Sequence, residues 1–241
     1  MQQPNAAPSS TATNASNGLQ PGVYTKSRIK EHLIGGKYSA EALFQLYVVQ
    51  TRAHLFEGRP HGAAEEMQFR SALATSVGLT INEVFIVGSA QTGFSTKPTA
   101  KLRDFDGEFK KTSKRRDKSD VDVAIVSARY FDQLHREIYK FTAGFKNSWT
   151  TNVYYADDES MQHFDLPRVD ANFYQYLARG WFRRDLVPDE FNFAFKNVVD
   201  DWKNRLDRKI SVAIYREWSL LRDYQIESFK LLKDDALKGY L

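Results

Sequence analysis

Three short apolar runs are the feature that most restricts how this sequence can fold. They are Val84 to Val87, Val121 to Val126 and Ile210 to Tyr215, and the first of them ends at Gly88. Runs of four to six mostly β-branched or aromatic residues are typical of buried strands. The sequence therefore predicts a small sheet whose strands come from separate parts of the chain.

Segments with helical spacing surround these predicted strands. Ser39 is a predicted N-cap, and residues 65–77 and 130–141 repeat apolar side chains at helical intervals. The same spacing predicts a helix over Phe173 to Trp181 and a final helix from Trp218. The residues expected to face inward on these helices are Leu43, Leu46, Tyr47, Val48, Phe69, Leu73, Val77, Leu221, Tyr224, Leu231 and Leu232. The predicted fold class is α+β, with helices before and after a small mixed sheet.

Composition excludes several classes of protein. Of the 241 residues, 42% are hydrophobic and 14% aromatic, which is enough for a buried core. The absence of cysteine excludes disulfides, thiolate metal sites and a cysteine nucleophile. Residues 1–25 carry no charge and are predicted to form a disordered polar tail. The sequence contains neither an apolar run of about 20 residues nor a signal peptide, so we expect a cytoplasmic protein without direct membrane insertion.

Two aspartates stand at the start of the second predicted strand. Alternation places Asp120 and Asp122 on one face and Val121 and Val123 on the other. Neighbouring carboxylates on an apolar strand repel each other and are costly to desolvate, and a divalent cation relieves both effects. Oxygen ligands suit Mg²⁺ or Mn²⁺. The pair is a candidate metal site, although so short a motif also fits a solvated turn.

The first predicted strand leads into the sequence Val87-Gly88-Ser89-Ala90-Gln91-Thr92-Gly93-Phe94-Ser95. Gly88 allows a sharp turn and close approach to a ligand, and Ser89 offers a hydroxyl at the start of a predicted helix. This arrangement predicts a phosphate-binding turn. It is not a Walker A loop, because Phe94 and not lysine follows Gly93.

The Gly88-Ser89 turn, with Gly93 and Ser95 behind it and Asp120-x-Asp122 on the next strand, resembles the signature of the polymerase-β-type nucleotidyltransferases. The resemblance covers residues 84–126. It implies transfer of a nucleoside monophosphate from an NTP or dNTP to a hydroxyl, with Mg²⁺ ions held by strand carboxylates. Asp120 and Asp122 would hold the metal, and Gly88, Ser89, Gly93 and Ser95 would contact the nucleotide. The implied nucleotidyltransferase domain spans residues 26–241, with a helical part at 26–80, a catalytic core at 81–215 and a C-terminal helix and tail at 216–241.

The sequence departs from this family at one position. Members usually add a third carboxylate from a later strand, but the run from Ile210 to Tyr215 contains no acidic residue. Five carboxylates elsewhere stay open as substitutes: Asp207 and Glu217, which flank the run, and Asp157, Asp165 and Asp170. The departure puts activation of the acceptor hydroxyl in doubt more than nucleotide binding.

A basic segment and dispersed aromatic residues lie close to these motifs. Lys110 to Lys118 carries six cations and one anion, and it is either a solvated loop or a guide for triphosphate or nucleic acid. Phe94, Phe105 and Phe109 are candidates for stacking on a base, with burial in the core as the alternative. The spacing of the five histidines does not indicate a zinc site.

The helical N-terminal half, the long insertion before Asp120 and the penultimate Tyr240 more closely resemble the nucleotidyltransferases of the Hailong anti-phage defence system. That likeness implies template-independent synthesis of single-stranded DNA oligomers from deoxynucleotides, dATP especially. The tyrosine would serve as primer, and the DNA product would act on a membrane-channel effector protein. Three alternatives remain open: a protein-AMPylating enzyme of a toxin–antitoxin pair, a synthase of oligonucleotide messengers, and a non-catalytic nucleic-acid-binding module.

Overall fold

The computed structural model describes residues 26–97, 100–107, 118–145 and 167–240. The predicted tail at 1–25 lies outside these ranges, as does the basic segment except for Lys118. Within the described residues, no helix is both long enough and apolar enough to cross a membrane.

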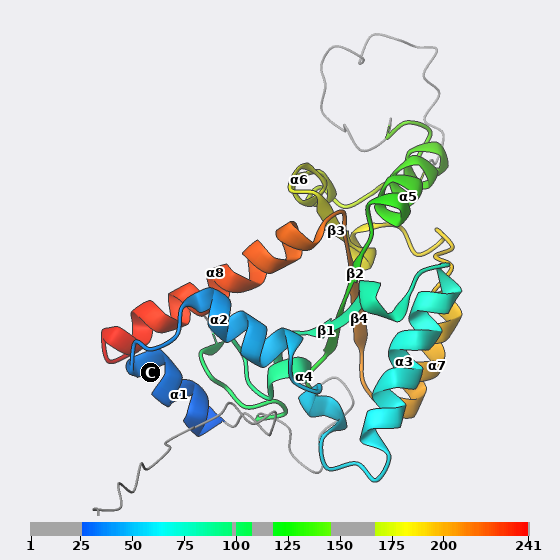
Figure 1. Cartoon of the computed structure of the whole chain (residues 1–241). Helices are drawn as coiled ribbons and strands as arrows, with labels where there is room; N and C mark the ends of the chain where they lie inside the picture. Colours follow the sequence, from blue (N-terminus) through cyan, green and yellow to red (C-terminus); the bar gives the residue numbers. More distant parts are fainter. Residues whose placement is uncertain (1–25, 98–99, 108–117, 146–166, 241) are drawn as a thin grey trace, which may run out of the picture.

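A four-stranded mixed sheet forms the centre of the fold (Figure 1). Its strands are β1 (Val84–Val87), β2 (Val121–Val126), β3 (Trp181–Arg183) and β4 (Ile210–Tyr215), in the spatial order β1-β2-β4-β3. Strand β2 is parallel to β4, whereas β1–β2 and β3–β4 are antiparallel. The three strands predicted from the apolar runs are confirmed, and so is the α+β class with a small mixed sheet.

Strand β3 was missed because helical spacing continues into it. Helix α6 (Phe173–Ala178) ends near Gly180, whose φ of +75° stops the helix and turns the chain toward the sheet. Trp181 then pairs with Tyr215 on β4, and their rings stack with centroids 5.2 Å apart. The predicted helical position of Trp181 is therefore wrong, because ring stacking and strand pairing override the local spacing.

Helices cover both faces of the sheet. The other helical elements are α1 (Lys26–Ile34), α2 (Ala40–Phe44) with the following π turn Gln45–Val49, α3 (Gly62–Ser76), α4 (Ser89–Thr92), α5 (Ala128–Phe141), α7 (Lys196–Leu206) and α8 (Trp218–Leu237). Short 3-10 turns occupy His54–Phe56, Ile81–Glu83 and, as η8, Arg184–Leu186. Ser39 caps α2 as expected, since its hydroxyl accepts a hydrogen bond from the Ala42 amide at 3.1 Å.

Side-chain alternation along β2 divides the core into two clusters. Val121, Val123 and Ile125 pack with residues of α3, α5 and α7, while Ala124 packs on the opposite face with α1, α2 and α8. Figure 1 shows this division, with α3 and α7 on one side of the sheet and α8, α2 and α1 on the other. Because Asp122 alternates with the valines, it belongs to the α8 face.

The buried face of α8 differs in part from the prediction. Leu221 and Leu232 are buried as expected, but Tyr224 and Leu231 are 50% and 40% exposed. The buried stripe runs through Leu221, Gln225, Phe229, Leu232 and Ala236 at intervals of three or four. Tyr224 and Leu231 lie at the edge of this stripe, and the edge position leaves Tyr224 accessible beside the sheet.

Candidate active site at the start of β2 and β4

The two predicted metal-binding aspartates lie where β2 begins. Asp120 directly precedes the strand and its side chain is 42% exposed, whereas Asp122 is the second strand residue and is largely buried. Their charges interact, since Asp120 helps to raise the pKa of Asp122. The two carboxylates are thus near enough for their charges to interact.

The Gly88 turn lies against the Asp122 carboxylate. In the β1–β2 register Val87 pairs with Asp122, so Gly88 follows directly beside it. Gly88 has φ +65° and ψ −154°, a conformation that is essentially restricted to glycine. A Cβ atom at this position would be 2.8 Å from Asp122 Oδ2. The group that Gly88 approaches is therefore a protein side chain, the candidate metal ligand Asp122, and the approach of this turn to a phosphate stays a prediction.

The remaining residues of the glycine-serine motif have structural contacts. Ser89 begins α4, which has only four residues. The positive helix end expected at this turn therefore comes from a single turn of helix. Gly93, at φ +80°, packs against the His54 ring, and Ser95 exchanges backbone hydrogen bonds with Arg103 and Leu102 at 2.7 and 2.9 Å. These contacts shape the loop after α4. A nucleotide contact for Ser89, Gly93 and Ser95 stays a prediction.

Burial raises the pKa of the Asp122 carboxyl above its ordinary value. The positive charge of Lys97 opposes this shift and the negative charge of Asp120 adds to it, with Arg183 and Lys209 also lowering the pKa. Among the described residues, no hydrogen bond or ion pair reaches the Asp122 carboxylate. A buried carboxylate beside a second one, without a direct partner, favours a bound proton or metal cation.

A third carboxylate is missing from the strand position next to Asp122. In the β2–β4 register Asp122 pairs with Ser211 and Ala124 with Ala213, so the adjacent places on this face are uncharged. On the other side of β4, Arg183 of β3 pairs with Ala213, and the Arg183 side chain forms an ion pair with Asp185. Within the described ranges, no group of three or more potential metal-ligating side chains is found.

The substitutes considered from the sequence have other positions or partners. Asp207 forms an ion pair with Lys118 Nζ at 2.5 Å. Glu217 comes after the C-terminal end of β4, whereas Ser211 lies at the opposite end of that strand. Asp170 accepts hydrogen bonds from the Asn172 backbone and side chain at 2.7 and 2.9 Å. Asp157 and Asp165 lie outside the described residues. The departure from the family pattern therefore persists in the described part of the chain.

One polar network near Asp120 was not foreseen. Arg208 makes a two-pronged ion pair with Asp106, and its Nη1 also donates to the Ser119 carbonyl at 3.2 Å. The Ser119 amide donates to Asp106 Oδ1 at 2.9 Å, and the Ser119 hydroxyl accepts from the Asp106 amide at 3.0 Å. Burial would raise the pKa of Asp106, but the hydrogen bonds from Arg208 and Ser119 outweigh it and the pKa is lowered. The network fixes the residue immediately before Asp120.

An aromatic group on the α8 face was also missed. The centroid of the Trp181 ring lies 4.4 Å from that of Tyr176, 5.2 Å from that of Tyr215 and 5.3 Å from that of Tyr224. Burial raises the pKa of both Tyr215 and Tyr224, and the charge of Asp122 contributes to each shift. Tyr224 therefore offers a half-exposed ring next to Trp181, within the electrostatic influence of Asp122. No sequence pattern joins these residues, which come from α6, β3, β4 and α8.

The aromatic residues proposed for base stacking and priming lie elsewhere. Phe94 is 1% exposed and packs on Tyr47 at 5.8 Å, so the alternative of a core role is correct. Phe105 is covered by the Arg208 guanidinium at 4.6 Å, and Phe109 lies outside the described residues. Tyr240 is 68% exposed, with its ring 5.8 Å from Lys101 Nζ.

The tail position is separate from the aspartates. Helix α8 ends beside α1, away from the sheet (Figure 1). The structure therefore does not bring Tyr240 to Asp120 and Asp122 in this arrangement.

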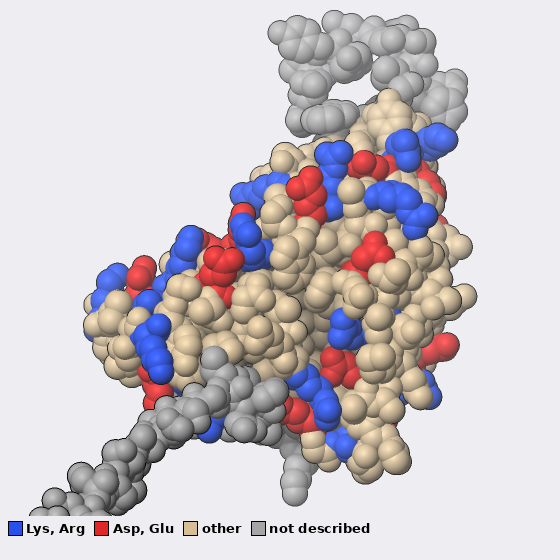
Figure 2. Space-filling view, viewed as in Figure 1, with Lys and Arg blue, Asp and Glu red and all other residues tan. Residues whose placement is uncertain are grey.

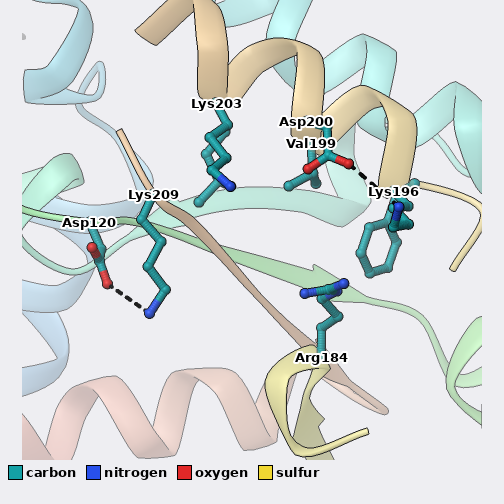
Figure 3. A pocket seen from close by; sticks show the side chains of 9 residues that line it. Asp120, Arg184, Lys196, Val199, Asp200, Lys203 and Lys209 are labelled. Atoms are coloured by element: carbon teal, nitrogen blue, oxygen red, sulfur yellow. Dashed lines mark ion pairs between the residues drawn. The ribbon is translucent and has the colours of Figure 1, made fainter. Parts of the chain in front are cut away.

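Asp120 also lines a cleft of about 710 Å³ between α7, η8 and the start of β4 (Figure 3). Lys209 forms an ion pair with Asp120 there, with 3.5 Å between Nζ and Oδ2. Comparison of the chain with protein-family models, with curated proteins and with solved structures finds no match.

Proposed function

We propose that this protein is a metal-dependent nucleotidyltransferase with a fold of the polymerase-β type. The observation that carries the proposal is the contact of the Gly88 turn with Asp122, because it sets the turn predicted to bind phosphate directly beside one of the two candidate metal-binding carboxylates. Strand pairing sets this arrangement, and the chain segments involved are separated by more than thirty residues.

The donor set at Asp120 and Asp122 fits Mg²⁺ or Mn²⁺. Both residues supply carboxylate oxygens, and Asp122 has no direct partner among the described residues. A bound divalent ion would supply charge neutralisation at the triphosphate and at the attacking hydroxyl. Removing the negative charge of Asp122 is therefore expected to abolish transfer.

The other side chains would orient the nucleotide. Gly88 lets the turn lie against the Asp122 carboxylate, and Ser89 offers a hydroxyl at the same turn. Lys97, Arg183 and Lys209 lie near enough to affect the pKa of Asp122, and their positive charges suit a triphosphate. In the transfer, the acceptor oxygen bonds to the α-phosphorus, the bond to pyrophosphate breaks, and the hydroxyl proton passes to solvent.

We further propose that the product is single-stranded DNA, made without template from deoxynucleotides and mainly from dATP. Tyr240 would prime the chain, and the DNA would act on a membrane-channel effector in anti-phage defence. Priming requires the residues after α8 to move, because Tyr240 contacts Lys101 at the far end of that helix. The exposed ring and the neighbouring Gly239, at φ +72°, are compatible with such a movement.

A non-catalytic nucleic-acid-binding module is the second candidate. It is favoured by Ser211 and Ala213, which stand where a third carboxylate would be expected. A module of this kind would keep the fold and bind an anionic strand without transferring a nucleotide.

Intact mass spectrometry after incubation with each NTP or dNTP and Mg²⁺ tests the proposal. A ladder of added deoxynucleotides indicates polymerisation, one added nucleotide indicates protein AMPylation or a related modification, and a small free product indicates messenger synthesis. Asp122→Asn should remove every such product, while the matched control Asp234→Asn on the exposed side of α8 should remove none. If the wild-type chain yields no product with any nucleotide, the enzyme proposal is refuted and the binding module is favoured.

A further inference from the structure

The cleft beside Asp120 gathers cations from three separate elements. Lys203 of α7, Arg184 of η8 and Lys209, which directly precedes β4, line this one cleft (Figure 3). Lys196 lies on the same wall, so four cations face two carboxylates, Asp120 and Asp200. On the face drawn in Figure 2, positive and negative side chains are intermixed.

Three of the cleft cations form long, partly exposed ion pairs. Lys209 is 3.5 Å from Asp120, Arg184 is 3.3 Å from Asp189, and Lys196 is 3.8 Å from Asp200. Pairs of this kind contribute only about 0–1 kcal/mol each. Phosphate oxygens can therefore replace the carboxylates at little cost.

The dimensions and floor of the cleft fit more than one phosphate. A volume of about 710 Å³ lies in the range of sites that hold a whole organic ligand. Phe195, Val199 and Ile210 supply apolar lining between the cations. Apolar contact for a sugar or base together with cations for phosphates matches a short stretch of single-stranded nucleic acid.

The sheet order places this cleft on the other side of the aspartates from the Gly88 turn. Strand β2 lies between β1, which ends just before Gly88, and β4, whose first residue, Ile210, lines the cleft. A nucleotide at the Gly88 turn and a strand in the cleft would thus approach Asp120 and Asp122 from opposite sides. We propose that the cleft binds the phosphate backbone of a single-stranded nucleic-acid acceptor, with its terminal hydroxyl at Asp120. This inference rests on the proposed nucleotidyl transfer.

Fluorescence anisotropy with a labelled 12-nucleotide single-stranded DNA tests the inference. The full-length protein is titrated in EDTA without nucleotide, at several NaCl concentrations, so that binding is measured without any reaction. Lys203→Gln is compared with Lys140→Gln, which removes the same charge from an exposed position near the end of α5. A parallel titration with dATP in the presence of Ca²⁺ measures binding of the nucleotide donor.

Loss of one phosphate contact should lower the slope of log affinity against log salt by about 0.7 and weaken binding roughly fivefold at 0.1 M salt. We expect this for Lys203→Gln, wild-type strand binding for Lys140→Gln, and unchanged dATP binding for both. Equal strand affinity for the two variants overturns the inference. Weaker dATP binding with unchanged strand binding in Lys203→Gln also overturns it and assigns the cleft to the donor triphosphate.

The mass-spectrometric assay separates this result from that of the proposed function. A wild-type chain that transfers no nucleotide refutes the enzyme proposal and, with it, the acceptor role, even if the strand is bound in the cleft. A chain that transfers nucleotides while Lys203→Gln binds the strand normally refutes only the assignment of the cleft.

Discussion

Replacing Gly88 with alanine tests the geometry on which the candidate site depends. The backbone at φ +65° and ψ −154° is strained for any residue with a side chain, which costs about 1–3 kcal/mol. The added Cβ would also stand 2.8 Å from Asp122 Oδ2, and overpacking of this kind costs about 1–3 kcal/mol. Together these effects should lower the free energy of unfolding by about 3 kcal/mol.

Thermal unfolding followed by circular dichroism measures this loss. For a domain of this size about 1 kcal/mol shifts the melting temperature by roughly 2–4 °C, so Gly88→Ala should melt roughly 6–12 °C lower. The matched control is Gly78→Ala, because Gly78 also has φ +65° but nothing lies within 4 Å of a Cβ there. This control should cost only about 1 kcal/mol, from the left-handed backbone alone.

A double-mutant cycle isolates the contact with Asp122. If the alanine methyl group meets the carboxylate, Asp122→Ala should recover about 1 kcal/mol or more of the Gly88→Ala loss. An additive double variant, together with equal losses at Gly88 and Gly78, would show that the turn does not lie against Asp122. The reasoning about the candidate site would then fail.

Three further predictions concern the carboxylates and the tail. Because burial raises the pKa of Asp122, the folded state binds this proton more tightly than the unfolded chain, and stability falls as pH rises from the ordinary pKa of 3.8 through the raised one. Asp122→Asn should therefore raise the melting temperature at pH 7 in EDTA and lose this advantage below pH 3.8; a lower melting temperature at pH 7 would contradict it. Arg208→Ala leaves Asp106 partly buried without its ion-pair partner, so it should lower the free energy of unfolding in urea by about 2–3 kcal/mol. A loss below about 0.5 kcal/mol would contradict this. Tyr240→Phe should stop primer-free synthesis but leave extension of an added oligonucleotide unchanged. Its melting temperature should also stay unchanged, because the Tyr240 side chain is 68% exposed. Continued synthesis without a primer would exclude Tyr240 from the mechanism.

The sequence by itself determined the strands with continuous apolar runs and the residues that punctuate them. Val121 to Val126 could be recognised because burial on both faces requires apolar side chains at nearly every position. Asp122 stood out for the same reason, as the one charge within that run. Gly88 could be recognised because a strand ended there at a residue that permits a sharp turn.

Only the tertiary structure decided which side chains surround the aspartates. Trp181 was assigned to a helix because its spacing from Tyr176 and Leu177 carries no information about the partner strand that captures it. Asp106 and Arg208 are 102 residues apart, and no local pattern marks such a pair. Spatial proximity between distant segments is set by sheet order and packing, which nearest-neighbour spacing does not encode.

The cleft illustrates the same division. No motif in the sequence singles out Lys196, Lys203, Arg184 or Lys209. They face one space because β4 lies beside β2 and brings α7 and η8 to Asp120. Local composition therefore fixed the identity of the strands and of the acidic pair. Chain topology fixed the electrostatic surroundings, because Coulomb interactions depend on separation in space and not along the chain.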